Sequence, residues 1–334
     1  MYQLSGFIPG NLEINAWNDI QPYFEKLKAS PVNSRSDLEE LILYYSDVIS
    51  VFHEKYAWSY INMSCNTKND DYVKCYENFA SVIEPEFRKS SNEIDKKISG
   101  SKFFNQLKSE RYEQLTKGLK RDLELFREKN VSLNAEISKF SSKFDQTAGG
   151  LTATIDGEDL PMPMAAKRLL SSDREERKTT WLAMQESRYA KKEEFDGLYN
   201  EMIILRHQVA QNAGYENYRD FQHDNLHRFD YSIDDALAFH EAVEQYIKPL
   251  ANEIGLKHCN KLNLDHDDYR PWDVSGQPKG QEPLKPFDDG QELTDIAIDI
   301  FSSLKPEFGL NLKVMETHSL FDLDSRKGKA PGGY

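Results

Sequence analysis

The sequence predicts a mostly α-helical protein, and three observations lead to this fold class. Apolar residues recur every three or four positions along most of the 334-residue chain, the period of a helix with one buried face. Capping signals precede several of these stripes, and short polar breaks separate them. The two-residue alternation typical of strands is confined to residues 151–155 and 321–324. Short connections between amphipathic helices favour antiparallel helical hairpins.

The composition is typical of a globular protein with a well-charged surface. Hydrophobic residues make up 39% of the chain and charged residues 29%. Forty-two basic and fifty-six acidic residues give a net charge of −14. Because such a surface repels phosphates, we expect neither nucleic acid nor an anionic membrane as a partner.

The cysteines and the first residues favour the cytoplasm. Cys65, Cys75 and Cys259 are odd in number and show no Cys-x-x-Cys spacing, which favours a reducing compartment over a disulfide framework. Residues 1–9 have neither the basic nor the apolar region of a signal peptide. The apolar run at 41–45 is too short to span a bilayer.

The first part of the chain predicts a series of helices. One begins near Ile20, with Pro22 tolerated in its first turn. Ser36-Asp-Leu-Glu39 matches a capping box, and the stripe behind it predicts a long helix running towards Tyr60. Pro85 predicts a kink within a later helix. Further apolar stripes lie at 72–87, 112–126 and 133–144.

Gly149-Gly150 ends this series and marks a predicted division into an amino-terminal helical region, 1–148, and a second domain, 149–334. Residues 151–155 alternate and are followed by Asp156-Gly157, which predicts a small β-hairpin with a tight turn. Capping signals then predict helices after Ser172, Asn217 and Ser232, and a Pro- and Gly-rich loop is expected at 276–290.

The last fourteen residues, 321–334, break the helical pattern and leave two interpretations open. One is a frayed basic tail at a chain end. The other is a short strand followed by a glycine turn, whose backbone can approach another molecule closely because paired glycines carry no side chain.

Three stretches carry a resemblance to a known family. Residues 321–334, FDLDSRKGKAPGGY, resemble the segment that precedes the zinc site in the oligoendopeptidase F and thimet-oligopeptidase family of metallopeptidases. Residues 206–221 are similar to that family's Arg-x-x-x-Ala-x-x-x-Gly-Tyr-x-x-Tyr pattern, and residues 269–273 resemble a Trp-Asp landmark. The resemblance runs from about residue 151 to residue 334, and the earlier helices match only in general character.

This resemblance implies helical hairpins that lead into an incomplete zincin-type oligopeptidase domain, with a small β-hairpin and a short C-terminal groove strand. The implied activity is zinc-dependent endopeptidase action on short peptides. The implied substrate-binding residues are Gly332, Gly333 and Tyr334 in the groove, with Arg326 supporting them. The groove strand would hold a peptide by edge pairing.

The zinc motif of the family is not found in the sequence. A zinc peptidase needs two imidazoles one helical turn apart with a glutamate between them, and no His-Glu-x-x-His occurs in the chain. We therefore expect zinc in the full-length protein, none bound by this chain, no catalytic residue within it, and no activity from this chain alone.

Several weaker histidine patterns are interpreted as structural. In His240-Glu-Ala-Val-Glu244 the second imidazole is replaced, and an apolar face from Ala236 to Leu250 is expected to be the packed side of that helix. His223 and His227 have the right spacing without the glutamate and are expected to face water. The remaining patterns are His53-Glu54, which lacks a second ligand, and the loosely spaced His258, Cys259 and His266.

A second class of function stays open at this point. The helices could form a non-enzymatic peptide-binding or scaffold protein that needs no metal. The residues that follow Tyr334 in the coding sequence would discriminate between the two, since a His-Glu-x-x-His motif there would indicate the enzyme.

Overall fold

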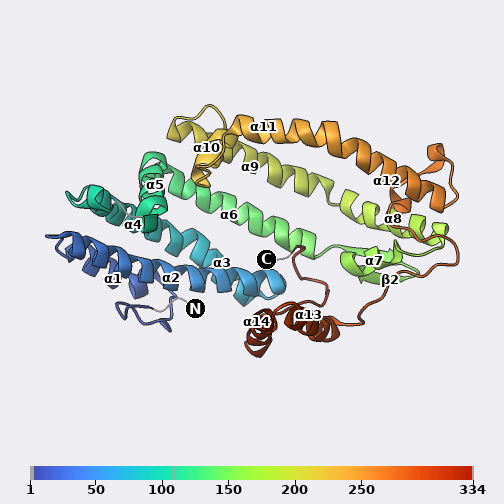
Figure 1. Cartoon of the computed structure of the whole chain (residues 1–334), viewed down its shortest axis with the longest axis horizontal. Helices are drawn as coiled ribbons and strands as arrows, with labels where there is room; N and C mark the ends of the chain where they lie inside the picture. Colours follow the sequence, from blue (N-terminus) through green and yellow to red (C-terminus); the bar gives the residue numbers. More distant parts are fainter. Residues whose placement is uncertain (1–3, 108–109, 333–334) are drawn as a thin grey trace. The chain divides into compact units, whose positions relative to one another are not determined.

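A computed structural model describes residues 4–107 and 110–332. Helices make up most of these residues, and one two-stranded antiparallel hairpin accompanies them (Figure 1). This confirms the predicted mostly α-helical fold class with a small β-hairpin. Among the described helices, none combines the length and the apolar character that a membrane crossing needs.

The chain folds into two compact units, and each unit takes two segments of the sequence. Unit 1 consists of Met1–Gln146 and Glu193–Glu241, and unit 2 of Thr147–Lys192 and Ala242–Tyr334. The chain therefore leaves unit 1, enters unit 2, and makes the same passage a second time. The sequence predicts two continuous domains, 1–148 and 149–334, whereas each compact unit combines two separate segments. The predicted domain division stays a prediction.

Unit 1 is built of helices around one large apolar core. The core is packed mainly by the first, second and fourth helices and includes Phe24, Phe52 and Phe87, the last two with rings stacked 3.7 Å apart. A smaller cluster joins Leu125, Val209 and other residues of the later helices. The helices are α1 (Trp17–Ala29), α2 (Arg35–Cys65), α3 (Asp70–Asn78), the π-helical η1 (Phe79–Ile83), α4 (Glu84–Ser99), the 3₁₀ turn η2 (Phe104–Gln106), α5 (Glu110–Leu125), α6 (Glu128–Gly149), α9 (Lys192–Ala213), α10 (Tyr218–Asn225) and α11 (Ile233–Ala242).

Two local predictions in unit 1 need correction. Helix α1 begins at Trp17, so Pro22 lies inside the helix. Helix α2 is capped by Ser34, whose hydroxyl accepts the Asp37 amide at 3.1 Å, and not by Ser36. Both serines precede an acidic residue by three positions, so the capping pattern alone cannot choose between them. A π-helical turn precedes Pro85, with the Glu84 amide bonded to the Phe79 carbonyl, and the predicted kink at Pro85 stays a prediction.

Unit 2 contains the hairpin and the helices that pack on it. Strands β1 (Thr152–Ile155) and β2 (Glu158–Pro161) pair with Ile155 opposite Glu158. Asp156 and Gly157 have φ angles of 55° and 82°, the left-handed values that a two-residue turn of the primed kind requires. The predicted Asp-Gly turn is therefore confirmed. The helices of the unit are α7 (Met162–Arg168), α8 (Arg174–Tyr189), the π-helical η3 (Val243–Ile247), α12 (Lys248–Lys261), the 3₁₀ turns η4 (His266–Asp268) and η5 (Pro271–Asp273), α13 (Gly290–Leu304) and α14 (Pro306–Thr317).

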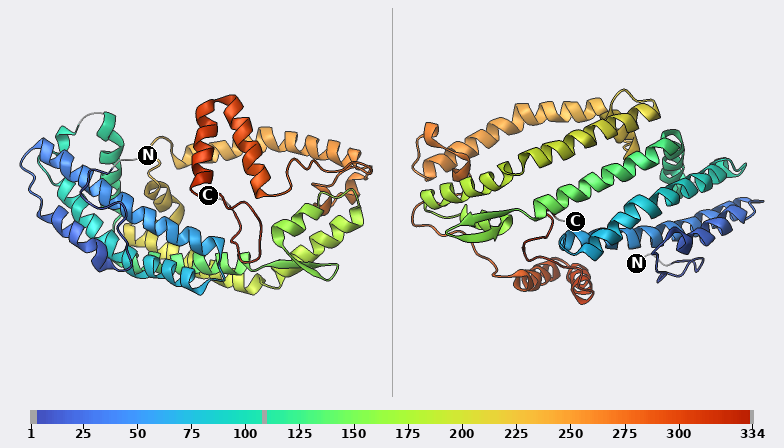
Figure 2. Two further views of the ribbon diagram at one scale, coloured as in Figure 1. Left: turned by 90° about the horizontal axis from the view of Figure 1, so that it is seen from below. Right: turned by 180° about the vertical axis from the view of Figure 1, so that it is seen from behind.

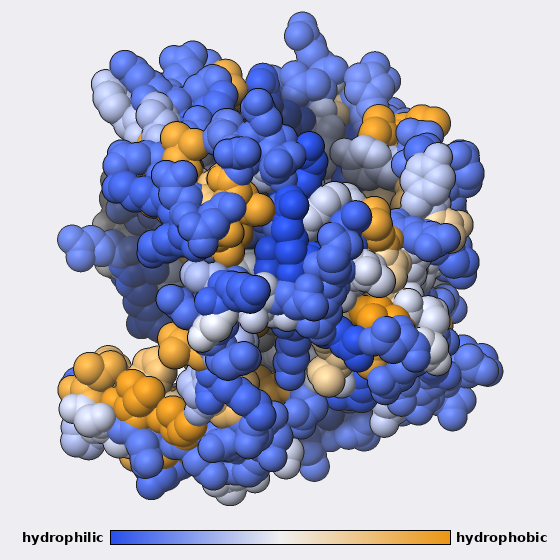
Figure 3. Space-filling view, turned by 90° about the vertical axis from the view of Figure 1, so that its right-hand side faces the viewer, coloured by the Kyte–Doolittle hydropathy of each residue, from blue (hydrophilic) through white to orange (hydrophobic). Residues whose placement is uncertain are grey.

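Helices α13 and α14 form a tight helical hairpin (Figure 2). A side chain at Gly309 would overlap the Ser302 hydroxyl, so the two helices meet closely there. Many apolar side chains of this pair are exposed, and Figure 3 shows hydrophobic residues gathered on the lobe at its lower left, where the pair lies. The exposed ones include Ile300, Phe301, Leu304, Phe308, Leu310 and Val314.

The predicted short C-terminal groove strand is not found as a strand. Residues 320–326 form no ladder with any other part of the described chain. A strand needs a neighbouring strand to accept its hydrogen bonds, and here the backbone carbonyls of Asp322 and Asp324 accept bonds from the Lys329 side chain instead. The segment is therefore an irregular, side-chain-braced turn.

Candidate functional site

The C-terminal segment, residues 321–332, is fastened to unit 2 at two glycines. The Gly328 amide donates to the Gly149 carbonyl at 2.9 Å, and a Cβ added at Gly149 would lie 2.9 Å from the Lys329 carbonyl oxygen. At the other end, the Gly290 amide donates to the Asp324 carboxylate at 3.1 Å, next to the start of α13. At Gly149 the two backbones approach more closely than a side chain would allow, whereas a Cβ at Gly290 would lie 3.1 Å from the Leu323 Cβ.

The charged residues of this segment brace one another. Arg326 makes a bidentate contact with Asp322, with both guanidinium nitrogens 2.7 Å from the carboxylate. Lys329 lies 3.2 Å from the same carboxylate. The guanidinium of Arg326 therefore holds the turn in place, which agrees with a supporting part for this residue but does not test its predicted part in binding a peptide.

Only one of the three predicted groove residues, Gly332, lies within the described part of the chain. Gly328 and Gly332 have φ angles of 91° and 108°, which side-chain-bearing residues rarely adopt. Gly332 is exposed. Gly333 and Tyr334, the other predicted groove residues, lie outside the described residues. The prediction that Arg326, Gly332, Gly333 and Tyr334 bind substrate therefore stays a prediction.

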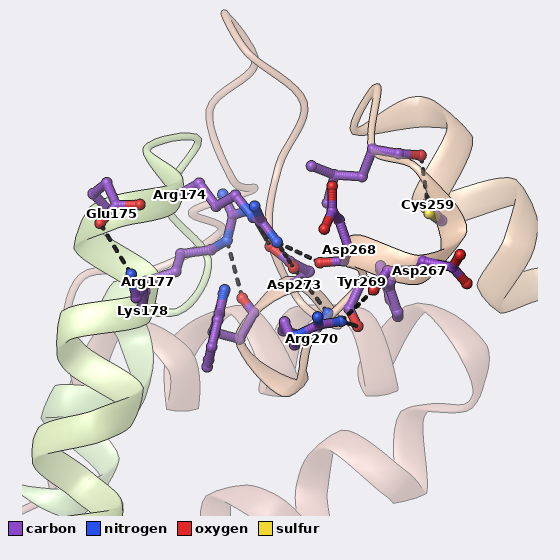
Figure 4. Close-up of polar contacts among 12 residues, drawn as sticks. Arg174, Glu175, Arg177, Lys178, Cys259, Asp267, Asp268, Tyr269, Arg270 and Asp273 are labelled. Carbon is purple, nitrogen blue, oxygen red and sulfur yellow. Dashed lines mark hydrogen bonds and ion pairs between the residues drawn. The ribbon is translucent and has the colours of Figure 1, made fainter.

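A buried carboxylate organises the Trp-Asp landmark. Asp273 is fully buried and accepts hydrogen bonds from two arginines of α8: Arg174 at 3.0 and 2.9 Å and Arg177 at 2.9 Å (Figure 4). The Arg270 amide adds a bond at 3.0 Å, and Arg177 also donates to the Trp272 carbonyl at 3.0 Å. This network ties residues 268–276 to the first turns of α8.

The bonds from the arginines lower the pKa of the Asp273 carboxyl. Burial raises the pKa of this carboxyl, but the bonds from Arg174, Arg177 and the Arg270 amide outweigh burial and hold the pKa below its usual value. Arg177 is itself only 2% exposed, and a Cβ at Gly276 would lie 2.5 Å from its guanidinium carbon. The landmark is thus a buried structural clamp in which the Asp273 carboxylate pairs with both arginines.

The histidine patterns do not assemble into a site. His240 and Glu244 are both exposed, and Phe239 and Leu250 on the predicted packed face are also 67% and 51% exposed, so that face is not packed as predicted. His227 is 2.7 Å from Asp122, so it does not simply face water.

His223 also departs from the expectation that it faces water. It packs its ring edge-on against Tyr231, with the ring centroids 5.5 Å apart, and its Nε2 is buried without a hydrogen-bond partner among the described residues. A local contact with Tyr231 therefore positions the His223 ring, whereas His227 is positioned by Asp122 on α5.

The described residues do not fit a zinc ion. Nowhere in residues 4–107 and 110–332 do three or more His, Cys, Asp or Glu side chains converge as metal ligands would. The histidines with ligand-like spacing are engaged with Asp122 and Tyr231 or exposed. No catalytic step through zinc can therefore be derived from these residues.

Sequence reasoning missed a cavity in unit 1. It has a volume of about 310 Å³ and is lined by side chains of α2, α4, α5, α6 and α10. Asp95 lies in its wall and is 9% exposed. The one signal in the sequence is an acidic residue between the buried Ile94 and Ile98 of α4, which by itself is too common to indicate a site.

Comparison with protein-family models shows to which family the chain belongs. The model described as the peptidase M3 N-terminal domain matches residues 9–126, and the model described as peptidase family M3 matches residues 169–334. The chain belongs to peptidase family M3. The amino-terminal helices, which resembled the family only in general character, are thus part of the match. A comparison with curated protein sequences finds no match.

Solved structures show the same fold over most of the chain. An oligoendopeptidase F from Bacillus anthracis str. Ames, described as putative, is similar at a TM-score of 0.88 and 20% identity over 95% of this chain and 58% of its own. A structure described as PZ peptidase A with an inhibitor is similar at a TM-score of 0.90 and 22% identity over 97% of this chain and 57% of its own. The M3 chain studied here therefore spans a little over half the length of these relatives.

Proposed function

We propose that this M3 chain is the amino-terminal portion of a zinc-dependent endopeptidase that hydrolyses short peptides, and that it contributes peptide binding without cleaving peptides alone. The observation that carries the proposal is the match of the M3 family model through residues 169–334, which include the braced C-terminal segment. The odd number of cysteines, without Cys-x-x-Cys spacing, supports a reducing compartment, so the proposed place of action is the cytoplasm.

The C-terminal segment is suited to holding an extended peptide. Within the described part of the chain, the amides of Ala330 and Gly332 have no hydrogen-bond partner. An extended peptide could pair with this free backbone as an added strand, and glycine at 332 would let the peptide approach closely. Arg326 and Lys329 would keep the turn rigid through Asp322, so that less conformational entropy is lost on binding.

Zinc enters the proposal only through the family. When bound, the metal would activate water towards the scissile carbonyl. Since the described residues do not fit a zinc ion, the proposal gives them no part in that step. What this chain contributes is binding and orientation of the peptide backbone.

Peptide cleavage and peptide binding are measured separately to test the proposal. A quenched fluorescent peptide with added zinc should stay intact with the 334-residue chain, and a longer chain that carries a His-Glu-x-x-His motif should cleave it in a chelator-sensitive way. Chelator-sensitive cleavage by the 334-residue chain would show that its metal site had been missed. A longer chain that is inert with zinc bound would favour the scaffold alternative.

The binding test uses backbone methylation. A strand added at an edge donates and accepts hydrogen bonds at every second residue, so only alternate amides of the peptide face the protein. Peptides methylated singly at successive amides should therefore alternate between weakened and unchanged binding, as measured by fluorescence anisotropy. Equal binding by all of them would rule out edge pairing.

A further inference from the structure

The cavity in unit 1 has no part in the proposed peptide-binding segment, which belongs to unit 2. It lies among α2, α4, α5, α6 and α10, whose courses can be followed in Figures 1 and 2. Its volume of about 310 Å³ is at the lower end of small-molecule sites, which range from about 300 to 1,000 Å³. A compact organic molecule would fill it.

The most unusual group in the cavity wall is the Asp95 carboxyl. It is 9% exposed, and no Lys, Arg or His in the described part of the chain forms an ion pair with it. Burial, assisted by the nearby Asp122 carboxylate, raises the pKa of Asp95 to about 7, although a hydrogen bond from Tyr45 opposes part of the rise. A buried carboxyl without a cation is costly, and perturbed groups of this kind gather where ligands bind.

The other charges around the cavity are already engaged. Glu84 on α4 is paired with Arg88 one turn later, and Asp122 on α5 is 2.7 Å from His227. Arg127, just before α6, donates to four backbone carbonyls at 2.7 to 3.3 Å, those of Glu124, Phe126, Asn212 and Ala213. Burial and Arg88 lower the pKa of His53 on α2, so its ring supplies no positive charge above neutral pH. Arg127 thus keeps its positive charge against neutral carbonyl oxygens, and among the described residues no cation pairs with Asp95 when it ionises.

The rest of the lining is both polar and apolar, and it includes Asn92, Asn130, Asn134 and Asn225. The Ser91 hydroxyl is buried and has no hydrogen-bond partner among the described residues. The hydroxyl of Tyr45 reaches the Ser91 carbonyl at 3.4 Å. The lining also includes the aromatic rings of Phe87, Phe126 and Phe221. A molecule with one cationic end and an apolar body can contact both kinds of group.

We propose that the cavity binds a small organic cation, a primary ammonium on an aromatic or aliphatic body, with the Asp95 carboxylate as its counter-ion. The ammonium supplies the missing cation at Asp95. The apolar body packs against the phenylalanines, where a cation beside a ring gains further attraction. The inference is independent of the peptidase proposal, because it concerns other residues in the other unit.

The test compares two probes that differ only at the charged end. Phenethylammonium and its neutral counterpart 2-phenylethanol are titrated calorimetrically into the 334-residue chain at about pH 8, where Asp95 is ionised. We expect saturable binding of both probes. The ammonium should bind about tenfold more tightly because it makes one charge-assisted hydrogen bond that the alcohol cannot make. As the pH falls through about 7, a proton competes for Asp95 and the preference for the ammonium is lost.

Two matched variants locate the site. Asp95→Asn keeps the shape and removes the charge, so it should bind the ammonium and the alcohol equally. Glu113→Gln removes the same charge from the exposed face of α5, where Glu113 pairs with Lys117 at 2.8 Å, and should leave both affinities unchanged. Circular dichroism melting of each variant shows that it is folded.

A third arm finds the source of the ammonium. A dipeptide with an amino-terminal phenylalanine competes with phenethylammonium if the cavity takes the amino end of a peptide, whereas its N-acetylated form does not. If neither competes, the cavity takes a free amine. The proposal is overturned if phenethylammonium shows no saturable binding, or if folded Asp95→Asn binds it as tightly as the unaltered protein.

Discussion

Two buried carboxyls show how surroundings set the behaviour of one residue type. Asp273 lies between Arg174 and Arg177, and these bonds hold its pKa below the usual value. Asp95 has a similar degree of burial but no cation, and its pKa rises to about 7. The first carboxyl stabilises the fold when it is ionised, and the second destabilises it.

Removing the Asp273 carboxylate should destabilise the protein strongly. In Asp273→Ala the guanidinium of Arg177, which is 2% exposed, would stay buried without its counter-ion. We expect a loss of about 3 kcal/mol in the free energy of unfolding, measured in urea at neutral pH. Because the pKa of Asp273 is lowered on folding, this loss should shrink as the pH falls below about 4. Asp267→Ala, at an exposed position six residues earlier, is the control and should cost little.

The opposite result is expected at Asp95. The folded protein keeps this proton up to a pH of about 7, whereas an unfolded chain releases it near 3.8. The free energy of unfolding therefore falls as the pH rises from about 4 to about 7. Asp95→Asn removes this penalty and should be more stable than the unaltered protein by on the order of 2 kcal/mol at about pH 8. The difference should vanish at about pH 4; a stability gain independent of pH would contradict the assignment.

At the scale of elements, backbone contacts shape the C-terminal segment more than any strand pairing does. Gly149, at the end of α6, accepts the Gly328 amide, and Gly290, at the start of α13, donates to Asp324. The segment is therefore positioned by two helix ends. The proposed peptide-binding amides of Ala330 and Gly332 follow directly after the first of these contacts.

Gly149→Ala should release this segment. The added methyl group would lie 2.9 Å from the Lys329 carbonyl oxygen and 3.1 Å from its carbon, both of them backbone atoms that cannot rotate away. We expect the Gly328 amide, whose bond to Gly149 is 2.9 Å, to exchange its hydrogen about tenfold faster, as followed by NMR. Gly255→Ala, on α12 with open space around it, is the matched control. Unchanged exchange at Gly328 in Gly149→Ala would mean that this contact does not hold the segment.

At the scale of the whole molecule, much apolar surface is left uncovered. Leu304 and Leu310 of the α13–α14 pair are 71% and 60% exposed, and Ile254 of α12 is 60% exposed. Exposed apolar patches of this kind bind dyes and promote self-association. By contrast, Met202 and Val209 of α9, on another apolar face of the chain, are 9% and 1% exposed.

The chain should therefore bind a hydrophobic dye in its folded state. We expect Leu304→Glu combined with Leu310→Glu to lower the fluorescence of bound 8-anilinonaphthalene-1-sulfonate at least about twofold and to reduce self-association in analytical ultracentrifugation. Lys313→Glu changes the charge of the same helical pair but not its apolar area, and should have a smaller effect. Equal fluorescence in all three proteins would place the dye elsewhere.

The sequence by itself determined the features that depend on near neighbours. The period of three to four apolar residues predicts helices because that spacing gives a helix one buried face, and Asp156-Gly157 predicts its turn because few residues tolerate positive φ. The resemblance of residues 206–221, 269–273 and 321–334 led to the family that the M3 models confirm. These signals are local, so they survive without knowledge of the fold.

Only the tertiary structure decided which distant residues meet. It brought Arg174 and Arg177 onto Asp273, nearly a hundred positions away, and turned the predicted groove strand into a turn because the Lys329 side chain takes the carbonyls that a neighbouring strand would need. It also placed Asp95 in a cavity wall where no cation of the described residues forms an ion pair with it. Whether an apolar stripe is covered, or a carboxyl is paired, depends on partners far away in the chain, and neither periodicity nor spacing encodes them.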